Sequence, residues 1–206
     1  MKIQARTVST NWQDAPGGLT WYFIGQPKTG KTTAAANWSS KGAEGVLILD
    51  TDLGADFVDG ANVVTVTSLN PPYEGEGDDR KIIPNLERGF YHRVGPQKGE
   101  PMEVYSLAEV FLWIKDNWQE LPYETLVIDT IDTVNQWIEK AVCEELGITA
   151  MGEGQWGADW GKARRKNVDL VKRLQMLMKQ HGSNLILTSH SKQSQMNDGK
   201  VQLSPD

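Results

Sequence analysis

One segment of the sequence has the residue types and spacing of a phosphate-binding loop. It consists of Gly25, Gln26, Pro27, Lys28, Thr29, Gly30, Lys31, Thr32 and Thr33. This is the pattern G-x-x-x-x-G-K-[ST], in which glycines permit a tight turn and backbone amides point at phosphates. Lys31 would reach the β- and γ-phosphates, and the Thr32 hydroxyl would bind Mg²⁺. We therefore predict that the chain binds ATP and Mg²⁺ through this segment.

Carboxylates that could serve this chemistry stand at the ends of two apolar runs. Asp129 ends the run 125–128, and Asp50 and Asp52 follow the run 46–49. In α/β proteins, ligands bind at the carboxyl ends of the strands. We assign Asp129 to the Mg²⁺ side, directly or through water, and Asp52 to orienting the attacking water, with Asp50 in support. The alternative for the second pair is structural, with Asp50 capping a turn and Asp52 solvated.

A further apolar run, residues 184–189, ends in His190. At a strand end the imidazole could sense the γ-phosphate by hydrogen bonding, although a lone histidine is more often structural. The catalytic residues that the sequence predicts are Lys31, Asp52, Asp129 and His190. The sequence shows neither a Ser-His-Asp arrangement nor the ligand spacing of a zinc site.

The elements that must carry these side chains alternate between strands and helices. Strands are expected at residues 19–24, 46–50, 62–67, 124–130 and 184–190. A helix is expected from Thr33 to about Ser40, a second after a capping box formed by Ser106 and Glu109, and a third that ends at Gly147. A long amphipathic helix to about Gln180 should place Val168, Val171, Leu174 and Met178 inward. This order predicts an α/β fold with a three-layer parallel sheet.

Three segments fall outside this alternation. Residues 1–18 form a polar arm before a domain that spans 19–206. Residues 70–105 are rich in glycine and proline and too long for a plain connection, so we expect an inserted loop with a short hairpin near 89–94. That insertion is either a disordered excursion or a lid or partner surface. Residues 191–206 are polar, with a turn signal at Asp198 and Gly199.

Composition bounds the class of protein. The chain has 206 residues, of which 39% are hydrophobic and 23% charged, as expected for a globular domain. Its net charge of −6 argues against a wholly basic nucleic-acid coat but permits a local basic site. A single cysteine, Cys143, excludes a disulfide framework. No apolar run has the length of a signal peptide core or a membrane span, so we expect a cytoplasmic protein without a membrane partner.

Aromatic and basic residues gather before and along the long helix. They are Trp156, Trp160, Lys162, Arg164, Arg165 and Lys166. Proteins that bind single-stranded nucleic acids combine a basic track with aromatic side chains on which bases stack. The alternative is a solvated helix face with tryptophans that pack against the protein.

The order of these motifs resembles the RecA core, and most closely the phage-encoded RecA-like AAA-domain NTPases that include single-strand annealing recombinases. The resemblance extends from Leu19 to about Lys192 and includes the loop 25–33, the strand ends at Asp50, Asp52, Asp129 and His190, and the Gly- and Trp-rich stretch. It implies a RecA-like P-loop NTPase core and an Mg²⁺-dependent ATPase in phage DNA recombination or annealing. It also implies single-stranded DNA as partner, assembly into a homo-oligomeric ring or filament, and a location in the host cytoplasm.

Two alternatives remain open at this point. In a P-loop small-molecule kinase, Asp50 and Asp52 would form the metal and acceptor site, and residues 70–105 would be a lid carrying Arg80, Arg88 and Arg93. In a nucleotide-binding interaction module, turnover would be insignificant. Strand order should discriminate: the Asp129 strand beside the P-loop strand favours an ATPase, whereas the Asp50 strand in that place favours a kinase.

Overall fold

The computed structural model of the chain describes residues 18–195 and 201–205. The arm expected at residues 1–18, apart from Gly18, and the turn expected at Asp198 and Gly199 therefore lie outside the described residues. In chain order the helices and strands are β1 (Thr20–Gly25), α1 (Lys31–Ala35), β2 (Val46–Asp50), β3 (Asn62–Ser68), β4 (Tyr73–Glu74), β5 (Lys81–Ile82), β6 (Tyr105–Ser106), α2 (Leu107–Asn117), β7 (Thr125–Asp129), α3 (Ile131–Leu146), α4 (Ala158–Gln180), β8 (Asn184–Gln195) and β9 (Val201–Pro205).

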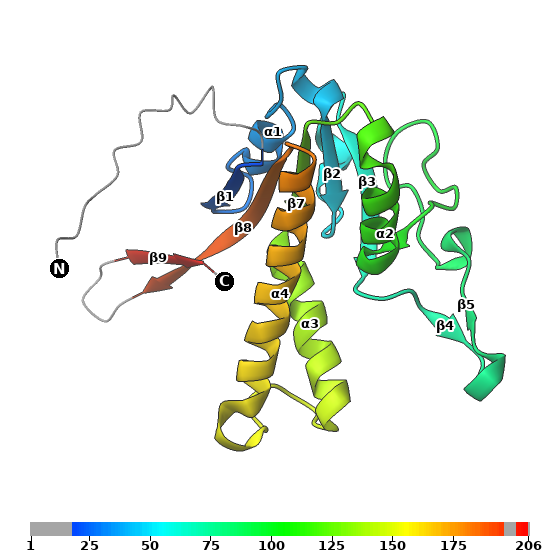
Figure 1. Cartoon of the computed structure of the whole chain (residues 1–206), viewed down its shortest axis with the longest axis vertical. Helices are drawn as coiled ribbons and strands as arrows, with labels where there is room; N and C mark the ends of the chain where they lie inside the picture. Colours follow the sequence, from blue (N-terminus) through cyan, green and yellow to red (C-terminus); the bar gives the residue numbers. More distant parts are fainter. Residues whose placement is uncertain (1–17, 196–200, 206) are drawn as a thin grey trace.

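Six parallel strands form the central sheet in the order β1-β8-β7-β2-β3-β6 (Figure 1). The register places Gly25 beside His190, and Asp50 beside Asp129. Four strand ends that the sequence predicts to be functional are therefore at one edge of the sheet.

Helices cover both faces of this sheet, which confirms the predicted α/β fold. On one face, Leu126, Ile128 and Leu185 pack with buried side chains of α2, α3 and α4. On the other face, Val127 and Ile186 pack with residues of and after α1. Strands β2 and β7 are buried along their whole length, as strands covered on both faces must be.

The helices agree with the expected ones except in two places. Helix α1 ends at Ala35 rather than near Ser40, because Ser39 and Ser40 leave the helical path and donate hydrogen bonds to the Glu124 carboxylate. In α4, Leu174 and Met178 are buried as predicted. The expectation that Val168 points inward is wrong, since this side chain is 42% exposed beside the edge strand β1. The capping box of α2 and the left-handed Gly147 at the end of α3 are both present.

The insertion at residues 70–105 follows a defined path. Strands β4 and β5 form one hairpin, with Tyr73 opposite Ile82. The short hairpin expected near residues 89–94 is also present: Tyr91 makes an antiparallel bridge with Pro101, and the Met102 backbone N–H donates to the Phe90 carbonyl at 2.8 Å. Arg88 ties the insertion to α2: its guanidinium makes two hydrogen bonds with Glu109, at 2.8 and 2.9 Å. The hairpin of β4 and β5 is therefore held to the body of the protein by Arg88. It lies at the far side of the sheet from β1 (Figure 1).

At the carboxyl end of the described chain, β8 is longer than expected. It continues past Ser189 to Gln195, and its extension pairs in antiparallel fashion with β9, from Ser191 opposite Pro205 to Gln195 opposite Val201. This two-stranded ribbon projects from the sheet (Figure 1). None of the helices in the described residues has the length and apolar character needed to cross a membrane.

Candidate functional site

The loop after β1 is a compact turn with its backbone facing solvent. Its residues 26–30 are exposed, and Gly30 has a left-handed φ of 84°. Within it, the Thr29 hydroxyl donates to the Gln26 carbonyl at 2.8 Å. The Lys31 ammonium donates to the carbonyls of Gly25 and Gln26, both at 3.0 Å. Lys31 thus lies over the turn, where it can exchange these carbonyls for phosphate oxygens.

The Thr32 hydroxyl and the Asp129 carboxylate meet directly across the sheet edge. Thr32 Oγ1 donates to Asp129 Oδ2 at 2.6 Å, although the two residues are far apart in sequence. The other carboxylate oxygen, Oδ1, accepts from the hydroxyl of Thr188 on β8. Asp129 is 2% exposed, so it reaches the site only by its tip. The structure brings together the two residues that the sequence assigns to Mg²⁺.

This pair fits a magnesium ion shared with a nucleotide. Mg²⁺ prefers oxygen ligands and is usually held by one or two carboxylates together with substrate phosphates and water. Among the described residues no group of three or more His, Cys, Asp or Glu side chains could hold a metal alone. Thr32 and Asp129 would therefore hold Mg²⁺ together with phosphate oxygens, and the ion would neutralise the phosphate charge.

Asp50 and Asp52 have different roles from one another. Asp50 is fully buried, and its carboxylate accepts the backbone N–H groups of Gly54 and Ala55, both at 3.1 Å. Burial raises the pKa of Asp50 to about 6. By accepting these two hydrogen bonds, the Asp50 carboxylate fixes the turn at residues 51–55, which carries Asp52. Asp52 is an exposed residue whose carboxyl also accepts from Gly54 N–H, at 3.0 Å. Partial burial of that carboxyl and the negative charge of Asp129 both raise the pKa of Asp52.

His190 is held in place by a residue that sequence reasoning missed. Asp132, in the first turn of α3, accepts the His190 backbone N–H at 2.7 Å and the Ser189 hydroxyl at 2.7 Å. Its Oδ2 lies 3.6 Å from His190 Nδ1. His190 is partly exposed, and its backbone lies beside Gly25, the first residue of the phosphate-binding loop. The signal for Asp132 and Thr188 was weak: each is a polar residue close to a strand end already assigned to the site.

The predicted nucleic-acid residues do not form one surface. Lys162 and Lys166 both form ion pairs with Glu145 of α3, at 2.6 and 2.5 Å. Trp160 and Arg164 instead line a cavity between α4 and β1. The remaining two, Trp156 and Arg165, are exposed.

The loop that carries Trp156 is built around one buried carboxylate. Asp159 is fully buried and accepts the backbone N–H groups of Gly152, Gly154 and Trp160, at 2.5, 3.3 and 2.8 Å. Trp156 itself has a positive φ of 57° and a fully exposed side chain. It lies in the connection between α3 and α4, which together extend beyond the sheet (Figure 1).

Strand order gives neither of the two expected arrangements in full. Strand β8 lies between the P-loop strand β1 and the Asp129 strand β7, and the Asp50 strand β2 is farther out. The arrangement required by the kinase alternative is therefore absent. Its proposed lid arginines also have other partners. Arg88 pairs with Glu109, Arg93 pairs with Asp56 at 3.3 Å, and Arg80 lies over the Tyr73 ring at 4.6 Å.

The fold and this site together define a P-loop NTPase-like domain: an α/β sheet with a phosphate-binding loop and a carboxylate beside the loop threonine. Comparison with known families agrees with this class. The family model described as AAA domain matches residues 18–205, so the chain belongs to the AAA domain family. No curated protein matches the chain.

Proposed function

We propose that this protein is an ATPase that hydrolyses Mg²⁺-bound ATP at the edge formed by β1, β8, β7 and β2. The observation that carries the proposal is the 2.6 Å hydrogen bond between Thr32 Oγ1 and Asp129 Oδ2. In P-loop NTPases the loop hydroxyl and a carboxylate at a strand end act on the same ion. Membership of the AAA domain family supports the same class.

Each remaining residue of the site has a role in this reaction. Lys31 stabilises the negative charge on the β- and γ-phosphates, as the loop lysine does in this class of site. Asp52, on the loop closed by Asp50, accepts a hydrogen bond from the attacking water and orients it. His190, positioned by Asp132, donates to the γ-phosphate. Proton transfer and charge stabilisation are thereby divided among separate side chains.

We further propose that hydrolysis serves recombination or annealing of single-stranded DNA, as in phage RecA-like proteins, by a homo-oligomer. Trp156 supports this step, because a fully exposed tryptophan on a loop organised by a buried carboxylate is suited to stack on a base. Arg164 and Arg165 are the two exposed cations of the predicted set that have no ion pair among the described residues, and because Arg164 lines the cavity beside β1, we assign the contact with DNA to Arg165. Lys162 and Lys166 contribute less, since Glu145 neutralises them.

The test is ATP hydrolysis by the full chain at low salt, with and without single-stranded DNA. We expect phosphate release that depends on Mg²⁺ and rises when DNA is added. Lys31→Ala should abolish release, whereas Lys115→Ala on the exposed side of α2 should not change it. Hydrolysis without DNA binding or stimulation would refute the recombination role alone. ATP binding without release would identify an interaction module, and phosphate transfer to a small molecule would identify a kinase.

A further inference from the structure

Exposed apolar side chains gather at two opposite edges of the molecule. At the β1 edge they are Tyr22, Ile24, Trp160 and Val168. In the insertion they are Tyr73, Ile82, Leu86, Tyr91 and Val94. Figure 1 shows the hairpin of β4 and β5 on one side of the sheet and β1 on the other. Apolar side chains that remain exposed in groups mark surfaces that bind other proteins.

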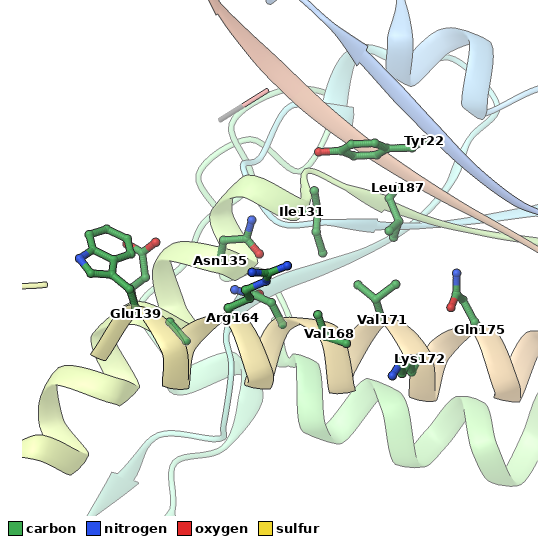
Figure 2. Close-up of a pocket in the computed structure, with 13 residues that line it drawn as sticks. Tyr22, Ile131, Asn135, Glu139, Arg164, Val168, Val171, Lys172, Gln175 and Leu187 are labelled. Carbon is green, nitrogen blue, oxygen red and sulfur yellow. The ribbon is translucent and has the colours of Figure 1, made fainter. Parts of the chain in front are cut away.

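The β1 edge carries an apolar groove. A cavity of about 580 Å³ lies between Tyr22 of β1 and helices α3 and α4. Figure 2 shows Tyr22 on one side of it and Val168 and Val171 of α4 on the other, with Leu187 of β8 between them. Among the residues that the structure describes, β1 is the last strand at this edge. Within the described residues, the outer backbone groups of β1 pair with no other strand, and such an edge can pair with another chain.

The polar lining of this groove indicates what could occupy it. Arg164 and Lys172 of α4 line it together with a single acid, Glu139 of α3. The Asn167 Oδ1 atom, which also lines it, is buried and accepts no hydrogen bond. A buried amide oxygen without a donor is uncommon and costly. The groove thus suits a segment that is apolar, acidic and able to donate N–H groups, as a polypeptide does.

The hairpin at the opposite edge has these properties. Tyr73 and Ile82 are paired across it and both are exposed. Between them the chain contains Glu74, Glu76, Asp78 and Asp79 against Arg80 and Lys81. The hairpin therefore presents apolar side chains and a net negative charge. The buried contacts of Arg88 with Glu109, Ile83 and Val104 hold its base to the body of the protein.

We propose that the hairpin of β4 and β5 from one copy of this chain docks in the groove between β1 and α4 of the next copy. The inference rests on the self-assembly proposed above and specifies the two surfaces that make it. A contact of groove with groove is disfavoured, because it would bring Arg164 and Lys172 close to the same cations of the partner. A contact between two different surfaces on opposite edges repeats from copy to copy and generates a ring or a filament.

This geometry also connects assembly to the nucleotide site. Tyr22 lies three residues before Gly25, on the strand that leads directly into the phosphate-binding loop. A neighbouring hairpin against β1 would contact the element that positions this loop. Nucleotide binding and docking of the neighbour are then expected to strengthen one another, since coupling between two sites is reciprocal.

The experiment uses two full-length variants that each disable one surface. Val168→Glu places an acid in the groove, and Ile82→Glu removes the apolar tip of the hairpin. Each alone should lower the association constant by roughly 100-fold. The Val168→Glu carboxylate would neutralise Arg164 and Lys172, which attract the acidic hairpin, and the Ile82→Glu carboxylate would have to enter an apolar part of the groove. Sedimentation velocity with ATP and Mg²⁺, but without DNA, should then show monomers. Leu112→Glu, a similarly exposed position on α2, should assemble as the unaltered chain does.

The decisive measurement is the mixture of the two variants. Each retains one intact surface, so an equal mixture should form a dimer that cannot grow further. Circular dichroism and ATP binding by each variant exclude misfolding as the cause of the monomers. Assembly of either variant alone, or a mixture of folded variants that stays monomeric, would refute the inference. Phosphate release by the unaltered chain and by Lys31→Ala is measured separately, so these outcomes are distinguishable from a failure of the proposed ATPase.

Discussion

At the scale of single residues, the site depends on hydroxyl groups that hold carboxylates in place. Asp129 is oriented by Thr32 and Thr188, and Asp132 by its contacts with Ser189 and the backbone of His190. Each hydrogen bond fixes a carboxylate that is largely removed from water, where an unpaired oxygen would be costly. The chemistry assigned to Asp129 and His190 therefore relies in part on Thr188 and Asp132, which have no assigned contact with the phosphates.

The hydroxyl of Thr188 offers a direct test of this dependence. Thr188→Val keeps the shape of the side chain but removes the hydrogen bond to Asp129 Oδ1. A hydrogen bond to a charged group contributes about 1.5–3 kcal/mol, so kcat should fall about tenfold or more, with ATP affinity changed much less. Thr188→Ser, which retains the hydroxyl, should restore most of the activity. An unchanged kcat in the valine variant would show that Asp129 needs no such support.

The pH dependence of hydrolysis tests Asp52. Its pKa is raised by partial burial and by the charge of Asp129, so its carboxyl takes up a proton at higher pH than an ordinary aspartate with a pKa of about 3.9. A protonated Asp52 cannot accept a proton from water. The rate should therefore decline on acidification while the pH is still above that ordinary value. Asp52→Asn should lower the rate and remove this part of the profile, and an unaltered profile would exclude Asp52 as the base.

At the scale of elements, a partly buried ion pair between Arg88 and Glu109 anchors the insertion to α2. The Arg88 side chain is 2% exposed and makes paired hydrogen bonds with Glu109, which also forms the capping box of α2. These hydrogen bonds lower the pKa of Glu109 to about 2. The same carboxylate thus begins a helix and anchors the hairpin, so its ionisation affects both.

This anchor predicts how stability varies with pH. A depressed pKa stabilises the fold above the unfolded value, and this contribution is lost as pH falls toward 2. For Glu109, which is partly exposed, it amounts to roughly 2–3 kcal/mol at neutral pH. Thermal unfolding of Glu109→Gln should show this loss at pH 7 and a weaker dependence between pH 5 and 2. Glu87→Gln, an exposed acid in the same insertion, is the control and should behave as the unaltered chain.

At the scale of the whole molecule, three surfaces lie apart from one another on one domain. The nucleotide site is at the edge of the sheet where the parallel strands end. The hairpin of β4 and β5 lies on the side of the sheet opposite β1, and Trp156 is in the connection between α3 and α4 (Figure 1). The net charge of −6 disfavours DNA over most of the surface. Binding of DNA should therefore be local and sensitive to salt.

Trp156 provides the test of that local binding. A stacked base contributes about 1–3 kcal/mol, so Trp156→Ala should weaken binding of single-stranded DNA by roughly 10-fold or more. Arg165→Ala should reduce the slope of log K against log salt, because one phosphate contact is lost. Trp113→Ala, which removes an exposed tryptophan of α2, serves as the matched control. Equal affinities for the Trp156 and Trp113 variants in a fluorescence anisotropy titration would place DNA elsewhere or exclude it.

Much of the fold followed from local patterns in the sequence. The apolar runs that end in Asp50 and Asp129 are β2 and β7, the capping box of Ser106 and Glu109 begins α2, and Gly147 ends α3. These features depend on residues close together in the chain. The short hairpin near residues 89–94 was expected from its local residues, whereas the hairpin at Tyr73 and Ile82 was not predicted from the sequence.

The sequence alone determined the phosphate-binding loop and the carboxylates at the strand ends, because the spacing of glycine, lysine and threonine and an apolar run before an acid are local signals. Tertiary structure alone decided which residues meet. It placed β8 between β1 and β7, which brings Thr188 to Asp129 and His190 to Gly25. It also buried Asp50 and left Asp52 exposed, and it separated Lys162 and Lys166 from Arg164 around one helix. Such contacts arise from strand order and helix packing, which join residues that are distant in the chain. They therefore produce no periodic pattern in the sequence from which they could be predicted.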